Sequence, residues 1–157
     1  MILRFIFIIL LFFSFSGHSY SAATSSGGGT ESNYDQAIKL IKAAKTYESK
    51  GKDKKAKKRY EKALKLLIKA NKKEPNQADT LNYLGFTTRK LGDYAGGEKY
   101  YLQGLAIDPN HKGINEYLGE LYVVTKRLDM AKERLEVLKG CKCEEYKELK
   151  EIINGTK

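Results

Sequence analysis

The sequence predicts an all-α fold, a short right-handed solenoid of three helical hairpins closed by a C-terminal capping helix. Two observations carry this prediction. The pair Leu84-Gly85 recurs as Leu118-Gly119 after 34 residues, and apolar residues follow helical spacing around both pairs. A single helical hairpin cannot bury its own apolar face, so about three must stack to be stable. The 157 residues are enough for one such elongated domain.

The first 23 residues have the features of a secretory signal peptide. Arg4 is followed by an unbroken apolar run from Phe5 to Phe13 and then by small residues. We expect cleavage after Ser21 or Ala23. An uncleaved anchor is the alternative, but a membrane-spanning helix needs about 20 apolar residues and this run is shorter. The expected product is exported, periplasmic or secreted, with no transmembrane segment after signal removal.

Basic charge is concentrated immediately after the linker expected at residues 24–33, which is rich in Gly and Ser. From Gln36 to Lys73 there are 15 Lys or Arg residues and 3 acidic ones, whereas residues 74–157 carry 13 basic and 14 acidic residues. The basic segment indicates either an anionic partner or a solvated lysine-rich helical face. Because export argues against nucleic acid, the partner to test is an anionic envelope surface.

The first hairpin is expected at about residues 37–77. Its turn, small and aromatic residues recur in the next segment at a constant interval of 41 residues. The earlier set is Tyr47, Gly51, Ala56, Tyr60 and Ala63, and the later set, in the same order, is Thr88, Gly92, Gly97, Tyr101 and Gly104. The seven additional residues lie between Ala63 and Pro75. Seven residues are about two helical turns, so this insertion lengthens the second helix and keeps its buried face in register.

The second hairpin is expected at residues 78–111. Residues spaced by three and four build an apolar stripe along its first helix: Leu81, Leu84 and Thr88. Beside them, Gly85 allows a second helix to approach closely. Gly92 can adopt the left-handed backbone conformation that often ends a helix, and Asp93 can cap the helix that follows.

The third hairpin is expected at residues 112–140. It is a weaker copy of the repeat, because Asn115 stands at the opening position of a large apolar residue and Leu138 at the second position of a small residue. A capping helix is then predicted at residues 144–153. Its apolar residues share one face and its charged residues lie on the other, the apolar set being Tyr146, Leu149, Ile152 and Ile153. This pattern closes the apolar end of a solenoid and presents a polar outer surface.

The spacing resembles that of the tetratricopeptide repeat, whose signature places Leu-Gly, Tyr, Ala, Phe and Pro along 34 residues. The second segment matches best, through Leu81, Leu84, Gly85, Gly97, Tyr101, Gly104 and Pro109. The resemblance covers residues 34–153. The Cys-x-Cys-Glu-Glu-Tyr segment after Gly140 also resembles the tail of some bacterial exported members. The resemblance of the tail implies no known activity, whereas that of the repeats implies a non-enzymatic module that binds a protein or peptide partner.

In this family, the first helices of successive repeats line a concave groove that receives an extended peptide or a partner helix. Transferred to matching positions, the resemblance implies a groove wall formed by Asn82, Phe86, Arg89, Lys90, Glu116, Glu120, Val123 and Val124. We expect an apolar centre at Phe86 and Val124, with charges of both signs around it, which suits a short mixed-charge segment. The alternative is that the four charged residues pair with one another across the repeats.

Few residues are suited to catalysis. His111 is the only histidine after the signal and lies in a turn, and no serine has a histidine at a related position. We therefore expect no enzyme, no catalytic site and no cofactor.

Cys141 and Cys143 are the most specific chemical feature of the sequence. Three interpretations stay open: a disulfide that pins the turn before the capping helix, redox exchange or pairing between chains, and copper(I) binding. No methionine or histidine cluster supports copper, and zinc would need further ligands. A thiol-redox or copper(I)-handling protein is thus the rival to the binding module.

Overall fold

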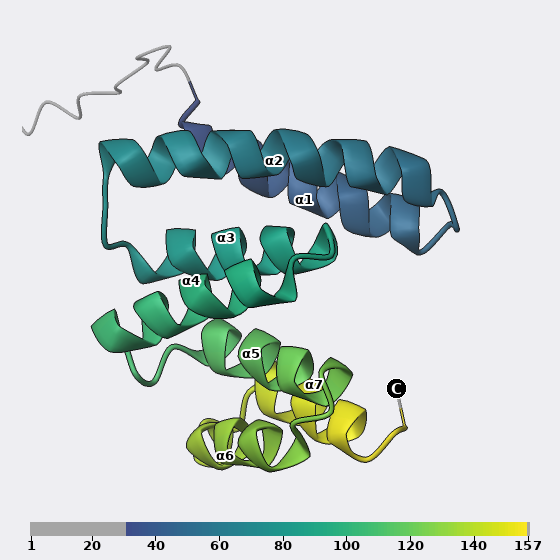
Figure 1. Cartoon of the computed structure of the whole chain (residues 1–157), viewed down its shortest axis with the longest axis vertical. Coiled ribbons are helices and arrows are strands. Elements are labelled where there is room, and N and C mark those ends of the chain that lie inside the picture. The colour runs from purple at the N-terminus through teal and green to yellow at the C-terminus, as the bar shows by residue number, and fades with distance from the viewer. Residues whose placement is uncertain (1–30, 157) are drawn as a thin grey trace, which may run out of the picture.

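The computed structural model describes residues 31–156, and these form seven α-helices and no strand (Figure 1). The helices are α1 (Asn33–Glu48), α2 (Asp53–Lys73), α3 (Ala78–Lys90), α4 (Tyr94–Ile107), α5 (Lys112–Val124), α6 (Leu128–Leu138) and α7 (Glu144–Ile153). The predicted fold class is confirmed. The expected signal peptide and residues 24–30 of the expected linker lie outside the described residues. None of the helices in residues 31–156 is long and apolar enough to cross a membrane.

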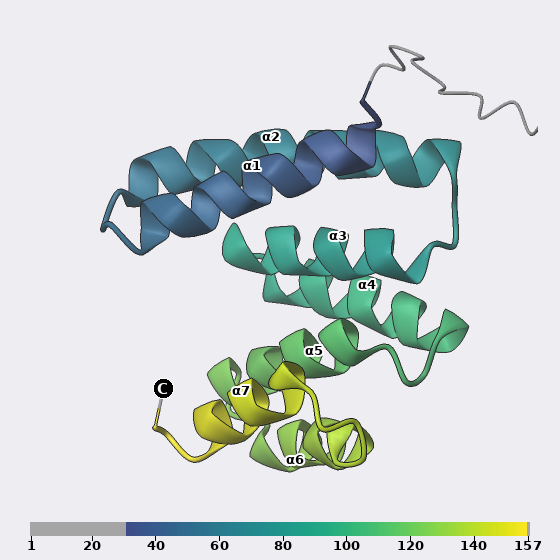
Figure 2. The same ribbon diagram turned by 180° about the vertical axis from the view of Figure 1, so that it is seen from behind.

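The helices pack as three consecutive hairpins, α1 with α2, α3 with α4 and α5 with α6. Figures 1 and 2 show these hairpins stacked along the long axis, with α7 against the last one. The first hairpin is visibly longer than the others. Its second helix, α2, has 21 residues where α4 has 14, which confirms that the seven-residue insertion lengthens this helix.

The turns within the three hairpins share one backbone geometry. Gly51, Gly92 and Lys126 occupy equivalent places and all have a positive φ, of 64°, 97° and 61°. Each turn is closed by the same type of backbone hydrogen bond, from Lys52 N to Tyr47 O, from Asp93 N to Thr88 O and from Arg127 N to Tyr122 O. The predicted cap is also confirmed, since Gly96 N donates to the Asp93 carboxylate at 2.8 Å.

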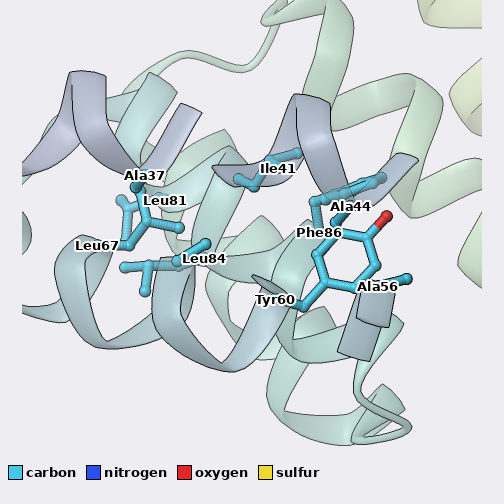
Figure 3. Packing of buried hydrophobic residues seen from close by; sticks show 10 residues of the cluster. Ala37, Ile41, Ala44, Ala56, Tyr60, Leu67, Leu81, Leu84 and Phe86 are labelled. Carbon is cyan, nitrogen blue, oxygen red and sulfur yellow. The ribbon is translucent and has the colours of Figure 1, made fainter. Parts of the chain in front are cut away.

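Two groups of buried side chains form the core. The first lies between α1, α2 and α3 and includes small residues that bring the helices close together, namely Ala37, Ala44, Ala56 and Ala63 (Figure 3). The second lies between α4, α5 and α6 around Tyr101, Ile114, Leu118, Leu121, Tyr122 and Ala131. Close approach at Gly85 is confirmed, because a Cβ there would lie 2.5 Å from the Tyr101 ring.

The capping helix α7 packs on α5 and α6 and closes the stack. Its Leu149 is 0% exposed and faces Gly119, where an added Cβ would meet Leu149 Cδ2 at 2.5 Å. In the second hairpin, the equivalent place beside Gly85 is filled by Tyr101 of the hairpin's own second helix. Because α7 supplies this contact in the third hairpin, its polar residues are brought alongside α5.

Candidate functional site

A hollow of about 400 Å³ is lined by residues from the first helix of each hairpin and from α7. It is lined by Lys45, Glu48, Phe86, Arg89, Lys90, Glu116, Tyr117, Glu120, Glu144, Glu145 and Glu148. Five of the eight residues expected in a groove are among them: Phe86, Arg89, Lys90, Glu116 and Glu120. The first helices of successive hairpins therefore do share one concave surface.

A second hollow of about 460 Å³ adjoins the first and contains Asn82. The two hollows share Glu116, Tyr117 and Glu145, and together we call them the groove. Val123 and Val124 line neither hollow. Val123 packs against the core around α5, and Val124 is 55% exposed at the last residue of that helix. The expected apolar centre at Phe86 and Val124 is therefore wrong, because α5 ends beyond the hollow.

Phe86 belongs to the core and is only 2% exposed. Its ring makes an edge contact with Tyr60 at a centroid distance of 5.9 Å and lies 4.9 Å from the Tyr117 ring. Figure 3 shows it near Ala44 and Tyr60. Lys45 Nζ lies 4.7 Å from the ring centroid, so the groove side of the ring is covered by a cation. Phe86 thus supports the groove floor and is not an exposed anchor for a ligand.

The three cations that line the first hollow already have partners within the described residues. Arg89 Nη2 lies 2.6 Å from Glu120 Oε2, and the Arg89 side chain is 9% exposed. Lys90 Nζ lies 3.0 Å from Glu48 Oε2, and Lys45 Nζ lies 3.2 Å from the Tyr117 hydroxyl. The alternative of pairing across the repeats is thus observed for Arg89 with Glu120, whereas Lys90 pairs with α1.

Glu116 differs from these residues because it is buried without a partner. It is 6% exposed, and no hydrogen bond or ion pair to its carboxyl is formed within residues 31–156. Burial, followed by the nearby carboxylates of Glu120, Glu148 and Glu145, raises the pKa of Glu116 to about 8, while Lys45 acts in the opposite direction. A buried carboxyl with so perturbed a pKa is a feature of binding and catalytic sites as well as of some ion-pair networks.

The groove is acidic although the chain as a whole is basic. Its lining contains eight carboxylates, from Glu48, Asp79, Asp108, Glu116, Glu120, Glu144, Glu145 and Glu148, and four Lys or Arg side chains. The net charge of the chain is +10. Three of these carboxylates come from α7, whose charged residues the sequence assigned to the outer surface of the solenoid. The sequence therefore did not indicate that the groove is acidic.

His111 lines the second hollow and has a structural role there. Its Nδ1 accepts a hydrogen bond from Ile114 N at 3.2 Å and caps α5, and its Nε2 lies 3.1 Å from Asp79 Oδ1. Both ring nitrogens are therefore engaged in local contacts. This agrees with the interpretation of His111 as a polar residue of the turn between two hairpins.

Cys141 and Cys143 lie in the turn between α6 and α7, and their sulfur atoms are in bonding contact. Neither residue lines the groove hollows. The basic segment also lies apart from the groove: α2 carries nine lysines, all exposed, and none of them lines either hollow. The three features singled out in the sequence thus occupy three separate places on the solenoid.

Comparison with known proteins identifies the repeats. Residues 40–66 and 78–111 match the family model of the tetratricopeptide repeat, so the chain contains repeats of this type in its first two hairpins. No curated protein sequence matches the chain.

Several solved structures are similar in fold. One is the first tetratricopeptide domain of Spaghetti (RPAP3) bound to the HSP90 peptide SRMEEVD, with a TM-score of 0.54, 19% identity and coverage of 81% of this chain and 98% of that chain. The Sgt2 tetratricopeptide domain from Aspergillus fumigatus has a TM-score of 0.56 and 17% identity, and the match covers 76% of each chain. The Yersinia enterocolitica type III secretion translocator chaperone SycD has a TM-score of 0.55 and 18% identity, and the match covers 78% of this chain and 83% of that chain. Identities this low show the fold alone.

Proposed function

We propose that this chain is a non-enzymatic interaction module that binds an extended segment of a partner protein in the groove. The observation that carries the proposal is the groove itself, two adjoining hollows built by α1, α3, α5 and α7 that share the buried carboxyl of Glu116. Helical repeats use such concave surfaces to bind partners. A carboxyl in a cleft whose pKa is strongly raised by burial is a candidate for a functional site.

The groove has a rigid part and a part open to a ligand. The ion pair between Arg89 and Glu120 is nearly enclosed, so it fixes α3 against α5. Lys90 and Glu48 are each 32% exposed in their side chains, so their pair can open to exchange partners with a ligand. A bound segment would therefore meet a preformed wall on one side and adjustable charges on the other.

Peptide-phage display against the purified chain would test this function. The groove variant Lys45→Glu with Glu145→Lys reverses two charges of the lining, and the control variant Lys58→Glu with Glu133→Lys reverses two exposed charges elsewhere. Circular dichroism must first show that both are helical. We expect the selected peptides to bind the wild type and the control but not the groove variant. Equal binding to all three proteins would exclude the groove as the site.

We also propose that the module works in the cell envelope after export, as in bacterial exported proteins of this type. The support is the order of charged, apolar and small residues in positions 1–23. Cell fractionation followed by N-terminal sequencing of the mature protein would test it. The expected first residue is Ala22 or Thr24. Recovery of the intact chain from the cytoplasm would refute export.

A second surface is favoured by the charge of α2. This helix carries nine lysines and Arg59 against Asp53 and Glu61, and we propose that it contacts anionic envelope surfaces. Sedimentation with vesicles of phosphatidylglycerol, and no sedimentation with vesicles of phosphatidylcholine, is the expected result. The binding should be lost at about 0.5 M salt because exposed charges are screened within a few ångströms. Salt-independent binding would contradict this mechanism.

The bonding contact of Cys141 and Cys143 favours a disulfide that pins the turn before α7. Mass spectrometry after alkylation, with and without reductant, should show two alkylated cysteines only in the reduced protein. The rival thiol or copper(I) function requires that the reduced chain bind copper(I) stoichiometrically or exchange with a thiol partner. Failure of both assays, with the disulfide present, would leave the cysteines a structural role.

A further inference from the structure

Three carboxylates converge at the end of the groove formed by α5 and α7. One carboxylate oxygen from each of Glu116, Glu120 and Glu148 lies within 4.8 Å of the corresponding oxygen of the other two. Glu116 and Glu120 are one helical turn apart on α5, and Glu148 approaches them from α7. This arrangement concentrates negative charge at one point, which is unfavourable unless a proton or a cation is also present.

Within the described residues no cation forms a hydrogen bond or ion pair with Glu116, although Lys45 acts on it electrostatically. Arg89 is bonded to Glu120, Lys90 to Glu48, and Lys45 to the Tyr117 hydroxyl. Glu116 is nevertheless more than nine-tenths buried and lines both hollows of the groove. A buried carboxyl without a partner is costly. Its position at the wall of an open hollow therefore indicates a positively charged group that enters from outside.

The geometry favours a primary ammonium. Three acceptors placed tetrahedrally around an ammonium nitrogen at about 2.8 Å lie about 4.6 Å apart. This separation is inside the limit of 4.8 Å within which the three carboxylate oxygens lie. A guanidinium is planar and pairs best with the two oxygens of one carboxylate. Calcium takes about six to eight oxygen ligands. The cluster offers fewer, because Arg89 already occupies one oxygen of Glu120 at 2.6 Å.

We propose that Glu116, Glu120 and Glu148 bind the ammonium group of a lysine side chain in the partner segment. This inference rests on the proposed function, because it assigns the chemical class of the segment that the groove receives. The hollow of about 400 Å³ has room for the whole side chain, and the Tyr117 ring offers a surface for its aliphatic part. The overall acidity of the groove adds a preference for a basic segment and disfavours an acidic one.

Four heptapeptide libraries, acetylated and amidated, would test the proposal. Their central residue is fixed as Lys, Arg, norleucine or Glu, and the flanking positions are mixed. Wild type should retain the Lys library at least tenfold more strongly than the norleucine library. Glu116→Gln keeps the shape of the side chain and should abolish this preference. The matched control Glu61→Gln, on the exposed surface of α2, should keep it.

Proton release supplies a second readout. Because Glu116 is largely protonated in the free protein at pH 7, binding of an ammonium should release up to about one proton. Glu120, Glu145, Glu148 and Lys45 also face this carboxyl, so the comparison is made with Glu116→Gln, which retains all four. Calorimetry in phosphate and in Tris buffer should show the release for wild type and its loss in the variant.

The outcomes separate the two proposals. Equal retention of the Lys, norleucine and Glu libraries, or a preference for Glu, would overturn the lysine site and leave the peptide-binding function standing. Retention of no library would overturn the peptide-binding function as well. Stoichiometric calcium binding that Glu116→Gln removes, together with no preference for the Lys library, would overturn the proposal in favour of a metal site.

Discussion

Replacing Glu116 by glutamine should change how the stability of the unliganded protein depends on pH. The pKa of this carboxyl is about 8 in the folded state against an ordinary value of 4.5. Because the folded pKa is raised, the stabilisation due to the bound proton is complete below pH 4.5 and is lost as the pH rises through about 8. Glutamine has no such titration. The variant should therefore gain stability relative to wild type between pH 5 and pH 9.

The size of the gain follows from the shift. At about 1.4 kcal/mol per pKa unit, the full shift would be worth at most about 5 kcal/mol. Glu116 lies at the wall of an open hollow, where solvent and Lys45 moderate the penalty, so we expect about 2–3 kcal/mol. Urea unfolding followed by far-ultraviolet circular dichroism at pH 5, 7 and 9 would measure the difference between the two proteins at each pH.

The control is Glu61→Gln, which removes an exposed carboxyl of α2 and should differ from wild type by a constant amount across this range. A constant difference for Glu116→Gln as well would refute the reasoning. It would mean that the Glu116 carboxyl ionises as if in water, and the case for an incoming cation would lose its energetic basis.

Three further substitutions test the packing that holds the groove. Gly119→Ala should lower the free energy of unfolding, measured by urea titration, by about 1–3 kcal/mol, because the new Cβ would overlap Leu149. In the control Gly140→Ala the new Cβ meets nothing within 4 Å, so the free energy of unfolding should change little. Phe86→Ala should cost about 3–5 kcal/mol by thermal or urea unfolding, and a cost below 1 kcal/mol would contradict its place in the core. Lys126 has a φ of 61°, a left-handed conformation that glycine adopts at lower cost, so Lys126→Gly should raise the urea midpoint by an amount equivalent to about 1 kcal/mol. A lower midpoint would show that the Lys126 side chain stabilises the turn.

The fold could be predicted from the sequence because each hairpin is built from local signals. Gly92 ends one helix, Asp93 caps the next, and the spacing around Gly85 sets which faces meet. The seven-residue insertion also has a purely local effect, the lengthening of α2. Such features depend on neighbours within a few turns of the chain, so periodicity and turn residues are sufficient to place them.

The groove was predicted less well because its character depends on helices that are distant in sequence. The resemblance to the tetratricopeptide repeat placed Phe86 on the groove face of α3, but it could not show that Tyr60 and Tyr117 would enclose the ring. It also could not show that α5 ends at Val124, beyond the hollow. A helical pattern identifies a face, whereas the depth of each residue on that face is set by the neighbouring hairpins.

The capping helix links the end of the solenoid to the chemistry of its groove. Leu149 is buried against Gly119 and closes the stack, while Glu148, the residue before it, completes the carboxylate cluster with α5. Since adjacent residues on a helix point in different directions, these two roles can change separately. Substitution of Glu148 should alter which side chain the groove accepts and leave the core intact. Substitution of Leu149 should destabilise α7 and thereby displace the acidic wall as well.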